Sequence, residues 1–165
     1  MRKVLSCTHP ALRKVAEPVQ VDAALLPLLK EMAEIMYTEE GAGLAAPQIG
    51  VSKQIIVIDI DDNGAQFFIN PQIYWRSEEM DIFDEGCLSV PGVRLKIERH
   101  TEIKVKFQDE TGKAHDIHAT ELLAHVLQHE IDHLKGKLNI DYLSPIQRTR
   151  ILNRIKRDER LQATA

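Results

Sequence analysis

The clearest helical pattern lies in the first quarter of the chain. Six apolar residues recur there at the spacing of one helix face: Leu25, Leu28, Leu29, Met32, Ile35 and Met36. This spacing predicts a helix from about Asp22 to Tyr37, and Pro27 falls near its start, where proline is tolerated. The segment GAGLAAPQIG (41–50) follows, and it is too rich in Gly and Ala to predict an element.

Strand patterns fill the middle of the chain. KQIIVIDI (53–60) is typical of a buried strand, and QFFINPQIYW (66–75) is typical of another that is interrupted at Pro71. TEIKVKFQ (101–108) alternates apolar and polar residues, a DETG turn follows, and KAHDIHA (113–119) returns. The two runs and the turn between them predict a β-hairpin.

Two further helices are predicted in the last third of the chain. One covers 121–135, with Thr120 as the candidate N-cap and Gly136 as a stop signal. The other covers 144–161 and has Pro145 in its first turn. Because the strands come as hairpin-like runs and the helices flank them instead of alternating with them, the pattern indicates an α+β fold with a mainly antiparallel sheet.

Length and charge narrow the class of protein. The 165 residues suit a single domain spanning 1–165, and the net charge of −4 excludes a global electrostatic footprint for free nucleic acid. No apolar run reaches the roughly 18 residues of a membrane span, and the N-terminus lacks a signal-peptide core, so we expect a cytoplasmic location. The stretch SEEMDIFDE (77–85) holds five carboxylates in eight residues, which favours a solvated loop or sheet edge.

The helix predicted over 121–135 is apolar over well over half of its circumference, so we expect it to be largely buried. One side carries Leu123, Leu127, Ile131 and Leu134. The adjacent side carries Leu122, Val126, His129 and His133. The remaining polar strip carries Glu121, Ala124, Gln128, Asp132 and Lys135. Two histidines therefore project from an apolar side, where an imidazole needs a hydrogen-bond partner or a metal.

The histidine pair has the spacing of a metal site. His129 and His133 are four residues apart, so both rings can reach one cation. Glu130 points about a quarter turn away and can reach a water beside that cation. The alternative is a pair of ordinary core histidines that are satisfied by hydrogen bonds.

A catalytic metal typically takes three protein ligands, and Cys87 is the best source of the third. It lies between Gly86 and the Val90-Pro91-Gly92 turn signal, and its thiolate would complete a Cys-His-His set. Alternatively Cys87 is a small buried apolar residue. Cys7, with His9 beside it, is the other thiol available, but nothing around it suggests chemistry.

Three segments taken together resemble the peptide deformylase family: GAGLAAPQIG (41–50), EGCLSVPG (85–92) and QHEIDHLKG (128–136). They occur in the family's order and at similar separations, and the resemblance runs over most of the chain. It implies an α+β fold in which the histidine helix packs in the middle of a partly open set of antiparallel strands. It also implies hydrolysis of the N-terminal formyl group of newly made polypeptides, with release of formate.

The resemblance also implies roles for individual residues. The family's metal ligands map onto Cys87, His129 and His133. Glu130 matches the acid/base residue, while Gln48 and the backbone N–H of Leu88 match the groups that hold the formyl oxygen. Family members commonly use Fe(II) and also work with Ni(II), Co(II) or, more weakly, Zn(II), so one divalent metal, Fe(II) first, is implied here.

Substrate binding is the part in which this chain departs from the family. The family holds its peptide through backbone groups that match Ala42, Gly43 and Gly86. Its pocket for the first side chain, usually suited to methionine, maps onto Ala42, Phe83, Arg94, Leu122, His125 and Val126. Ala42 is smaller than the branched residue common there, and His125 replaces a frequent aliphatic residue. His125 either lines the pocket or is a satisfied core or rim histidine.

The sequence leaves the role of Arg94 open and favours a structural role for Glu85. Arg94 either pairs with the acidic stretch or contacts the substrate backbone. Glu85 is expected to pair with Arg99, which is a structural role.

The terminal segment adds a partner hypothesis. Residues 144–165 carry six Lys and Arg against two Asp and Glu. That composition is typical of a solvated helix face, but in bacterial family members a C-terminal helix touches the ribosome.

Two rival functions stay open at this point. One is a metallohydrolase, a peptidase or a deacylase, that acts on a different small amide. The other is non-catalytic, either a structural zinc module or an inactive metal-binding relative. A structural module would need a fourth protein ligand.

Overall fold

The computed structural model describes residues 1–165. Its α-helices are α1 (Leu26–Thr38), α2 (Glu121–Leu134) and α3 (Pro145–Ala163). Its strands are β1 (Gly43–Ala45), β2 (Ile55–Ile58), β3 (Gln66–Arg76), β4 (Met80–Cys87), β5 (Val90–His100), β6 (Glu102–Gln108) and β7 (Ala114–Thr120). Short 3-10 helices are η1 (Pro10–Arg13), η2 (Ala23–Leu25), η3 (Ala46–Ile49) and η4 (Asn139–Tyr142).

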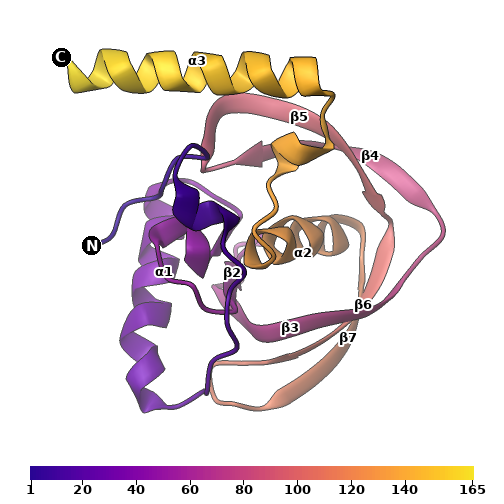
Figure 1. Ribbon diagram of the computed structural model, residues 1–165. Helices are drawn as coiled ribbons and strands as arrows, with labels where there is room; N and C mark the ends of the chain where they lie inside the picture. The colour runs from indigo at the N-terminus through magenta and orange to yellow at the C-terminus, as the bar shows by residue number, and fades with distance from the viewer.

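The strands form two antiparallel sheets. The larger sheet has the order β1-β2-β3-β6-β7, and the smaller sheet pairs β4 with β5. Helix α2 lies in the middle, with strands around it, α1 on one side and α3 outside the sheets (Figure 1). The α+β prediction, with mainly antiparallel strands around the histidine helix, is therefore confirmed.

Strand β2 shows why the sheet needs a helix on each face. Ile56 and Ile58 face a core cluster that contains the apolar side of α2. Ile55 and Val57 face the opposite way, into a second cluster with the apolar side of α1. All four side chains are buried, because successive strand residues alternate between the two covered faces. The predicted buried strand is confirmed with shorter bounds.

Helix α1 follows the predicted spacing but begins later than predicted. Its buried side chains are Leu29, Met32, Ile35 and Met36. The start of the predicted helix is instead the 3-10 turn η2, because the Asp22 carboxylate accepts a hydrogen bond from the Ala24 N–H at 3.0 Å. An aspartate that bonds the backbone two residues on favours a tight turn at that point.

Strand β3 continues through Pro71, where an interruption was predicted. The pairing register with β6 shifts between Ile69 and Gln72, and Asn70 has a φ of 52°. The Asn70 side chain satisfies Val19 by accepting from its N–H and donating to its carbonyl. The proline is therefore accommodated by a local irregularity of the strand, and the strand does not end.

The hairpin of β4 and β5 corrects the interpretation of the acidic stretch. Residues 80–85 belong to strand β4, so the edge interpretation is right for them and the loop interpretation is wrong. Nor is the stretch solvated throughout, because Glu85 is 3% exposed. Its carboxylate pairs with the equally buried Arg99 of β5, as the resemblance implied. Strand β5 itself was not predicted.

Helix α2 is largely buried, as predicted. Two residues of the strip that was expected to be polar are buried as well. Ala124 is buried in the core cluster beside Leu127, and Gln128 is buried with its amide bonded to both backbone groups of His100. Thr120 occupies the N-cap position without a side-chain cap bond. The hairpin that precedes α2, predicted over 101–119, is confirmed as β6 and β7.

The C-terminal end of α2 is sealed by the N-terminal segment of the chain. The Ala16 N–H donates to the Leu134 carbonyl at 2.8 Å, and Arg13 pairs with Asp141 at 2.7 Å. Gly136, with a φ of +73°, ends the helix as predicted, and a Cβ on it would lie 2.5 Å from the Arg13 carbonyl oxygen. The backbone conformation and the close approach each demand glycine at this position.

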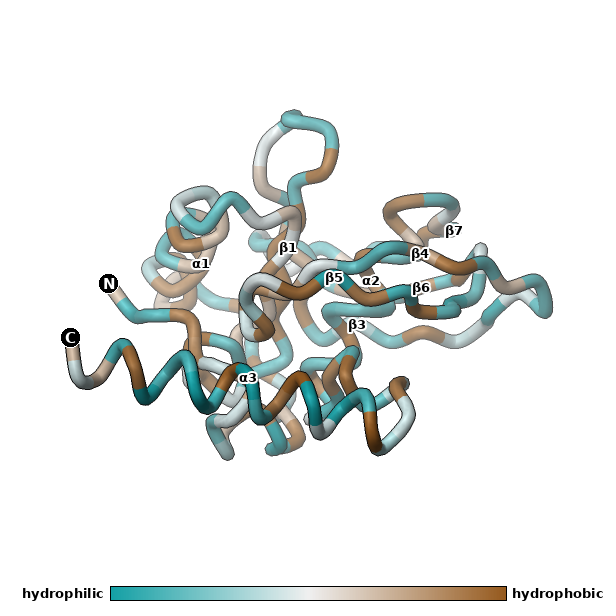
Figure 2. The backbone as a smooth tube through the Cα atoms, turned by 90° about the horizontal axis from the view of Figure 1, so that it is seen from above, coloured by the Kyte–Doolittle hydropathy of each residue, from teal (hydrophilic) through white to brown (hydrophobic).

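Helix α3 packs against β5 from outside the sheets and alternates hydrophilic and hydrophobic segments along its length (Figure 2). Ser144 is its N-cap and Pro145 its first residue, close to the prediction, and it runs two residues further than predicted. Only Ile155 is buried, and Arg154 donates to the Gly92 carbonyl at 2.9 Å. None of the helices is apolar over a length that would cross a membrane.

Candidate active site

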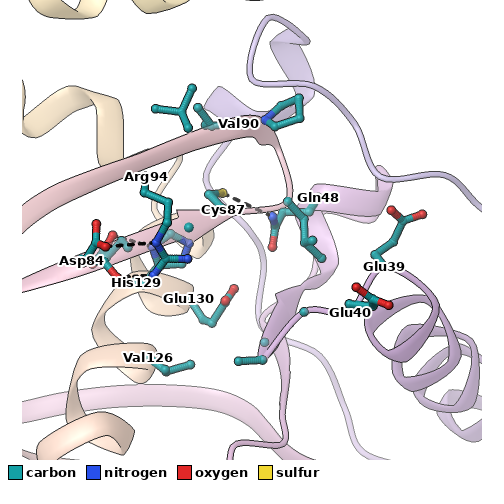
Figure 3. Close-up of a pocket in the computed structure, with 18 of the residues that line it drawn as sticks. Glu39, Glu40, Gln48, Asp84, Cys87, Val90, Arg94, Val126, His129 and Glu130 are labelled. Carbon is teal, nitrogen blue, oxygen red and sulfur yellow. Dashed lines mark hydrogen bonds and ion pairs between the residues drawn. The ribbon is translucent and has the colours of Figure 1, made fainter.

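Three candidate metal ligands converge between β4 and α2. Cys87 ends β4, and His129 and His133 lie one turn apart on α2. One ligand atom from each lies within 4.8 Å of the others, and the Cys87 Sγ and His133 Nε2 are 3.5 Å apart. The two imidazoles meet nearly edge to face, with centroids 5.0 Å apart. The predicted set is therefore brought together (Figure 3 shows Cys87 and His129).

The chemistry of this set fits a divalent transition metal. One thiolate and two imidazoles are soft to borderline donors that suit Fe(II) or Zn(II). Burial lowers the pKa of His133 well below its usual value, which keeps a nitrogen lone pair free for a metal. The His129 Nδ1 donates to Glu85 Oε2 at 2.8 Å, which leaves Nε2 for coordination. Three ligands leave one position open for water or substrate, and a closed structural site would have four.

Glu85 and Arg99 form a buried ion pair beside the candidate metal ligand His129. Arg99 binds both oxygens of the Glu85 carboxylate and also reaches Asp132 at 2.9 Å. Burial raises the pKa of Glu85, but hydrogen bonds from His125, His129 and Arg99 outweigh it and hold the pKa far below its usual range. The carboxylate is therefore ionised when it orients His129.

Glu130 faces the cavity from α2, beside the candidate ligands (Figure 3). It is 4% exposed, and its Oε2 has no protein partner. Burial raises the pKa of Glu130 to about 7. A Cβ on Gly43 would lie 2.7 Å from Glu130 Oε1, so only glycine leaves room for the carboxylate there. Glu130 can therefore exchange a proton with a group in the cavity.

Gln48 lies across the cavity from α2, on the 3-10 helix η3 (Figure 3). Its Oε1 accepts from the Ala45 N–H at 2.9 Å, and its Nε2 donates to Ser89 Oγ at 3.1 Å. The same Nε2 lies 3.8 Å from Cys87 Sγ. These contacts fix which end of the amide is the donor, and they place that donor beside the candidate metal ligand.

A cavity of about 610 Å³ joins these groups. Most residues expected to bind substrate line it: Ala42, Gly43, Gly86, Leu88, Arg94, Leu122, His125 and Val126. Phe83 does not line it and instead stacks on His125, with ring centroids 4.0 Å apart. His125 is both a wall of the cavity and a buried histidine in polar contact with Glu85, because its Nε2 lies 3.1 Å from Glu85 Oε1.

Several residues of the cavity were not foreseen. Glu39 and Glu40 lie at one end of it (Figure 3), just after α1. Arg94 pairs with Asp84 at 3.1 Å, so the ion pair with the acidic stretch is present. Ser89 does not line the cavity, but it is fully buried and orients Gln48. Its place in the segment EGCLSVPG (85–92), two residues after Cys87, was the signal in the sequence that could have found it.

The alternative thiol is not part of any such cluster. Cys7 is buried, and burial raises its pKa. The neighbouring His9 caps η1, where its Nδ1 accepts from the Ala11 N–H at 3.1 Å. Both residues therefore have structural environments.

Fold and site together define a metal-dependent hydrolase with a Cys-His-His centre and a carboxylate beside it. The family model for polypeptide deformylase matches residues 1–149. A peptide deformylase from Hahella chejuensis is 43% identical over 164 residues, covering 98% of each chain. One from Bartonella tribocorum is also 43% identical, over 95% of this chain and 92% of that protein.

Solved structures agree with the sequence matches. A peptide deformylase from Legionella pneumophila has a TM-score of 0.92 and 43% identity, over 100% of this chain and 99% of that one. A peptide deformylase from Ehrlichia chaffeensis in complex with actinonin has a TM-score of 0.93 and 36% identity, over 97% and 98%. The chain belongs to the polypeptide deformylase family, and its activity is metal-dependent peptide deformylation.

Proposed function

We propose that the substrates are newly made polypeptides with an N-formyl-methionyl terminus, which are hydrolysed to formate and a free N-terminal methionyl chain. The observation that carries this proposal is the convergence of Cys87, His129 and His133 beside Glu130 and Gln48 at one cavity. A metallohydrolase of another small amide would share the ligands and Glu130. The Gln48 amide donor, held in place beside Cys87, favours a reaction in which a small carbonyl oxygen is bound there.

Cys87, His129 and His133 would hold one divalent metal, with Fe(II) as the first candidate. Zn(II), Ni(II) and Co(II) are the substitutes that the same donors can accept. When bound, such a metal supplies a water nucleophile at neutral pH and polarises a carbonyl. The Cys-His-His donor set supports a borderline-soft metal but does not by itself select one member of that group.

Glu130 serves as the acid/base residue. Its carboxylate lies in the cavity with Oε2 free of protein partners, so it can take the proton of the attacking water. It can then deliver a proton to the amine that leaves as formate separates. Proton transfer by a positioned side chain typically contributes about 10²–10⁴-fold to the rate.

Gln48 and the Leu88 N–H stabilise the oxygen of the formyl group as negative charge grows on it. Ala45 and Ser89 hold the Gln48 amide in one orientation, so no reorganisation is needed during the reaction. A single donor of this kind is worth about 2.7–4 kcal/mol in comparable sites.

The peptide binds as an added strand. β1 is the end strand of the larger sheet, and Ala42 and Gly43 line the cavity at that edge. Gly86, from β4, lines the cavity as well. Edge backbone groups that line a cavity can pair with an extended chain, which is β-augmentation. The first side chain then enters between Leu122, His125 and Val126, with Phe83 behind His125 and with Ala42 and Arg94 at the same cavity.

Formate release from N-formyl-Met-Ala-Ser tests the proposal. The protein is purified without oxygen and loaded with Fe(II) or Ni(II), and N-acetyl-Met-Ala-Ser is the control. We expect formate from the formyl peptide alone. Release of acetate at a comparable rate, or no formate from metal-loaded protein, would contradict the proposed substrate and favour a hydrolase of another amide.

We also propose a cytoplasmic location and contact with the ribosome through α3. The helix is exposed along most of its length and carries six basic against two acidic residues. Pelleting with ribosomes at increasing salt tests this contact. Binding that weakens with salt and is lost on deletion of residues 146–165 is expected, and unchanged binding by the truncated protein would contradict the contact.

A further inference from the structure

His125 is not a candidate metal ligand, but it contacts the same carboxylate as the ligand candidate His129. It lies one helical turn before His129 on α2 and is 5% exposed. Its Nε2 is 3.1 Å from Glu85 Oε1, while His129 Nδ1 is 2.8 Å from Glu85 Oε2. Since an ionised carboxylate only accepts hydrogen bonds, the His125 Nε2 carries the hydrogen. Both imidazoles therefore contact the same carboxylate from successive turns of one helix, His129 through a hydrogen bond and His125 through a polar contact.

The Glu85 carboxylate is saturated by this arrangement. Oε1 accepts from Arg99 Nε and contacts His125 Nε2, and Oε2 accepts from Arg99 Nη2 and His129. Arg99 alone would leave the β4 side chain free to tilt about the guanidinium plane. The second imidazole ties Glu85 to α2 at another point, and stacking on Phe83 of β4 fixes the His125 ring in turn.

We propose that His125 is a positioning residue for the metal ligand His129 and acts through the Glu85 carboxylate. Partners beyond the ligands set the orientation and basicity of a metal-bound imidazole. His125 acts one contact further out than Glu85, so its removal weakens metal binding less than removal of Glu85. This role deepens the proposed function, on which it rests, because the same ring lines the cavity that receives the substrate.

Two substitutions separate the contact between His125 Nε2 and Glu85 from the shape of the His125 side chain. His125→Leu removes the donor and keeps an apolar volume, whereas His125→Gln places an amide N–H at about the position of Nε2. The matched control is His118→Leu, because His118 on β7 also contacts a carboxylate, that of Glu102 at 2.6 Å, but lies outside the cavity.

Co(II) affinity, measured by competition with a chelator, and the Co(II) visible absorption spectrum are the readouts. We expect His125→Leu to weaken Co(II) binding about threefold to tenfold, at or below the lower end of outer-partner effects. His125→Gln should stay within about twofold of the unsubstituted protein, and His118→Leu should be unchanged.

Equal Co(II) affinity and spectra for His125→Leu and the unsubstituted protein would overturn the proposal, even with a changed KM, because His125 would then be a cavity wall only. Equal weakening by the Gln and Leu variants would overturn it as well. Circular dichroism of the metal-free proteins checks folding, and His125→Met replaces the Leu variant if that variant does not fold. Absence of formate release by the unsubstituted protein would refute the proposed substrate, whereas the Co(II) comparison needs no substrate.

Discussion

Helices α2 and α3 differ in how many of their residues are buried and in what holds them in place. α2 buries nine of its 14 residues, among them two metal-ligand candidates and Glu130, whereas α3 buries one of 19. The start of α3 is set by local signals, Ser144 and Pro145, and its side chains face solvent along most of its length. α2 makes no side-chain cap and is held by the sheets around it. The candidate catalytic residues therefore lie on the helix that tertiary contacts bury. Substitutions on the two helices should differ sharply in their effect on activity and on the free energy of unfolding.

Glu130→Gln on α2 should have the largest effect. The amide has nearly the same shape but cannot accept and return a proton, so we expect formate release to fall about 10²–10⁴-fold. Metal content, measured by elemental analysis of both proteins, should be unchanged, because Glu130 is not among the three clustered ligands. A rate within tenfold of the parent would show that proton transfer does not depend on this carboxylate.

Glu85→Ala should be the most destabilising change beside α2. Glu85 and Arg99 are each 3% exposed, so the alanine leaves a buried guanidinium without its main partner. Breaking a buried pair costs about 3–5 kcal/mol of unfolding free energy. Urea unfolding of the metal-free proteins measures it without a contribution from metal affinity. A loss below 1 kcal/mol would mean that water or Asp132 compensates Arg99.

Within α3, Ile155 and Arg157 sharpen the comparison. Ile155 is 3% exposed and packs in a core cluster with Leu12 and Leu138, so Ile155→Ala should cost about 2–5 kcal/mol of unfolding free energy. Arg157, with 69% of its side chain exposed, should tolerate alanine within about 0.5 kcal/mol. The same urea experiment measures both. Equal costs would show that α3 is held by its exposed face as well.

The connection between α2 and α3 should be sensitive to pH through Asp141. Burial raises the pKa of Asp141, but hydrogen bonds from Arg13 and the Leu138 N–H outweigh it and hold the pKa below its usual value. Its stabilisation is therefore complete above the unfolded-state pKa of about 3.9 and is lost as the pH falls through the lower folded-state value. Asp141→Asn should lower the unfolding free energy by about 1 kcal/mol at pH 7.

Comparing the two proteins from pH 7 to pH 2 by thermal unfolding tests this sign. The difference between them should be constant down to about pH 4 and shrink below it. A difference that grows as the pH falls would contradict the depressed pKa of Asp141.

Periodicity was enough to predict α1 and α2, because each has an apolar side at helical spacing, whereas α3 was predicted with Pro145 in its first turn as the signal. Periodicity also predicted the His129 and His133 pair, since both ligands lie on one helix. It could not predict β5, where Leu95, Ile97 and Arg99 alternate into the interior. An arginine side chain is typical of the protein surface. Here the free-energy cost of burying Arg99 is offset by its partner Glu85, which is distant along the chain.

Ligands that come from different elements needed more than spacing. Cys87 was a candidate from the glycine and turn signals around it, and the resemblance to a family assigned it the ligand role, because no local pattern links the end of β4 to α2. Glu39 and Glu40 were missed for the same reason, since nothing in their own segment shows that they border the cavity. Ser89 was missed because its bond to Gln48 joins segments that are distant along the chain. The exclusion of Phe83 from the cavity also depends on the stacking geometry of His125, which a sequence does not contain.

The seal between the N-terminal segment and the end of α2 has a consequence for synthesis. Residues 13–16 come early in translation, but their partners Leu134, Gly136 and Asp141 are among the last to be made. Residues 13–16 therefore stay without these partners until most of the polypeptide has emerged. The end of α2 is thus sealed only when the chain itself is nearly finished.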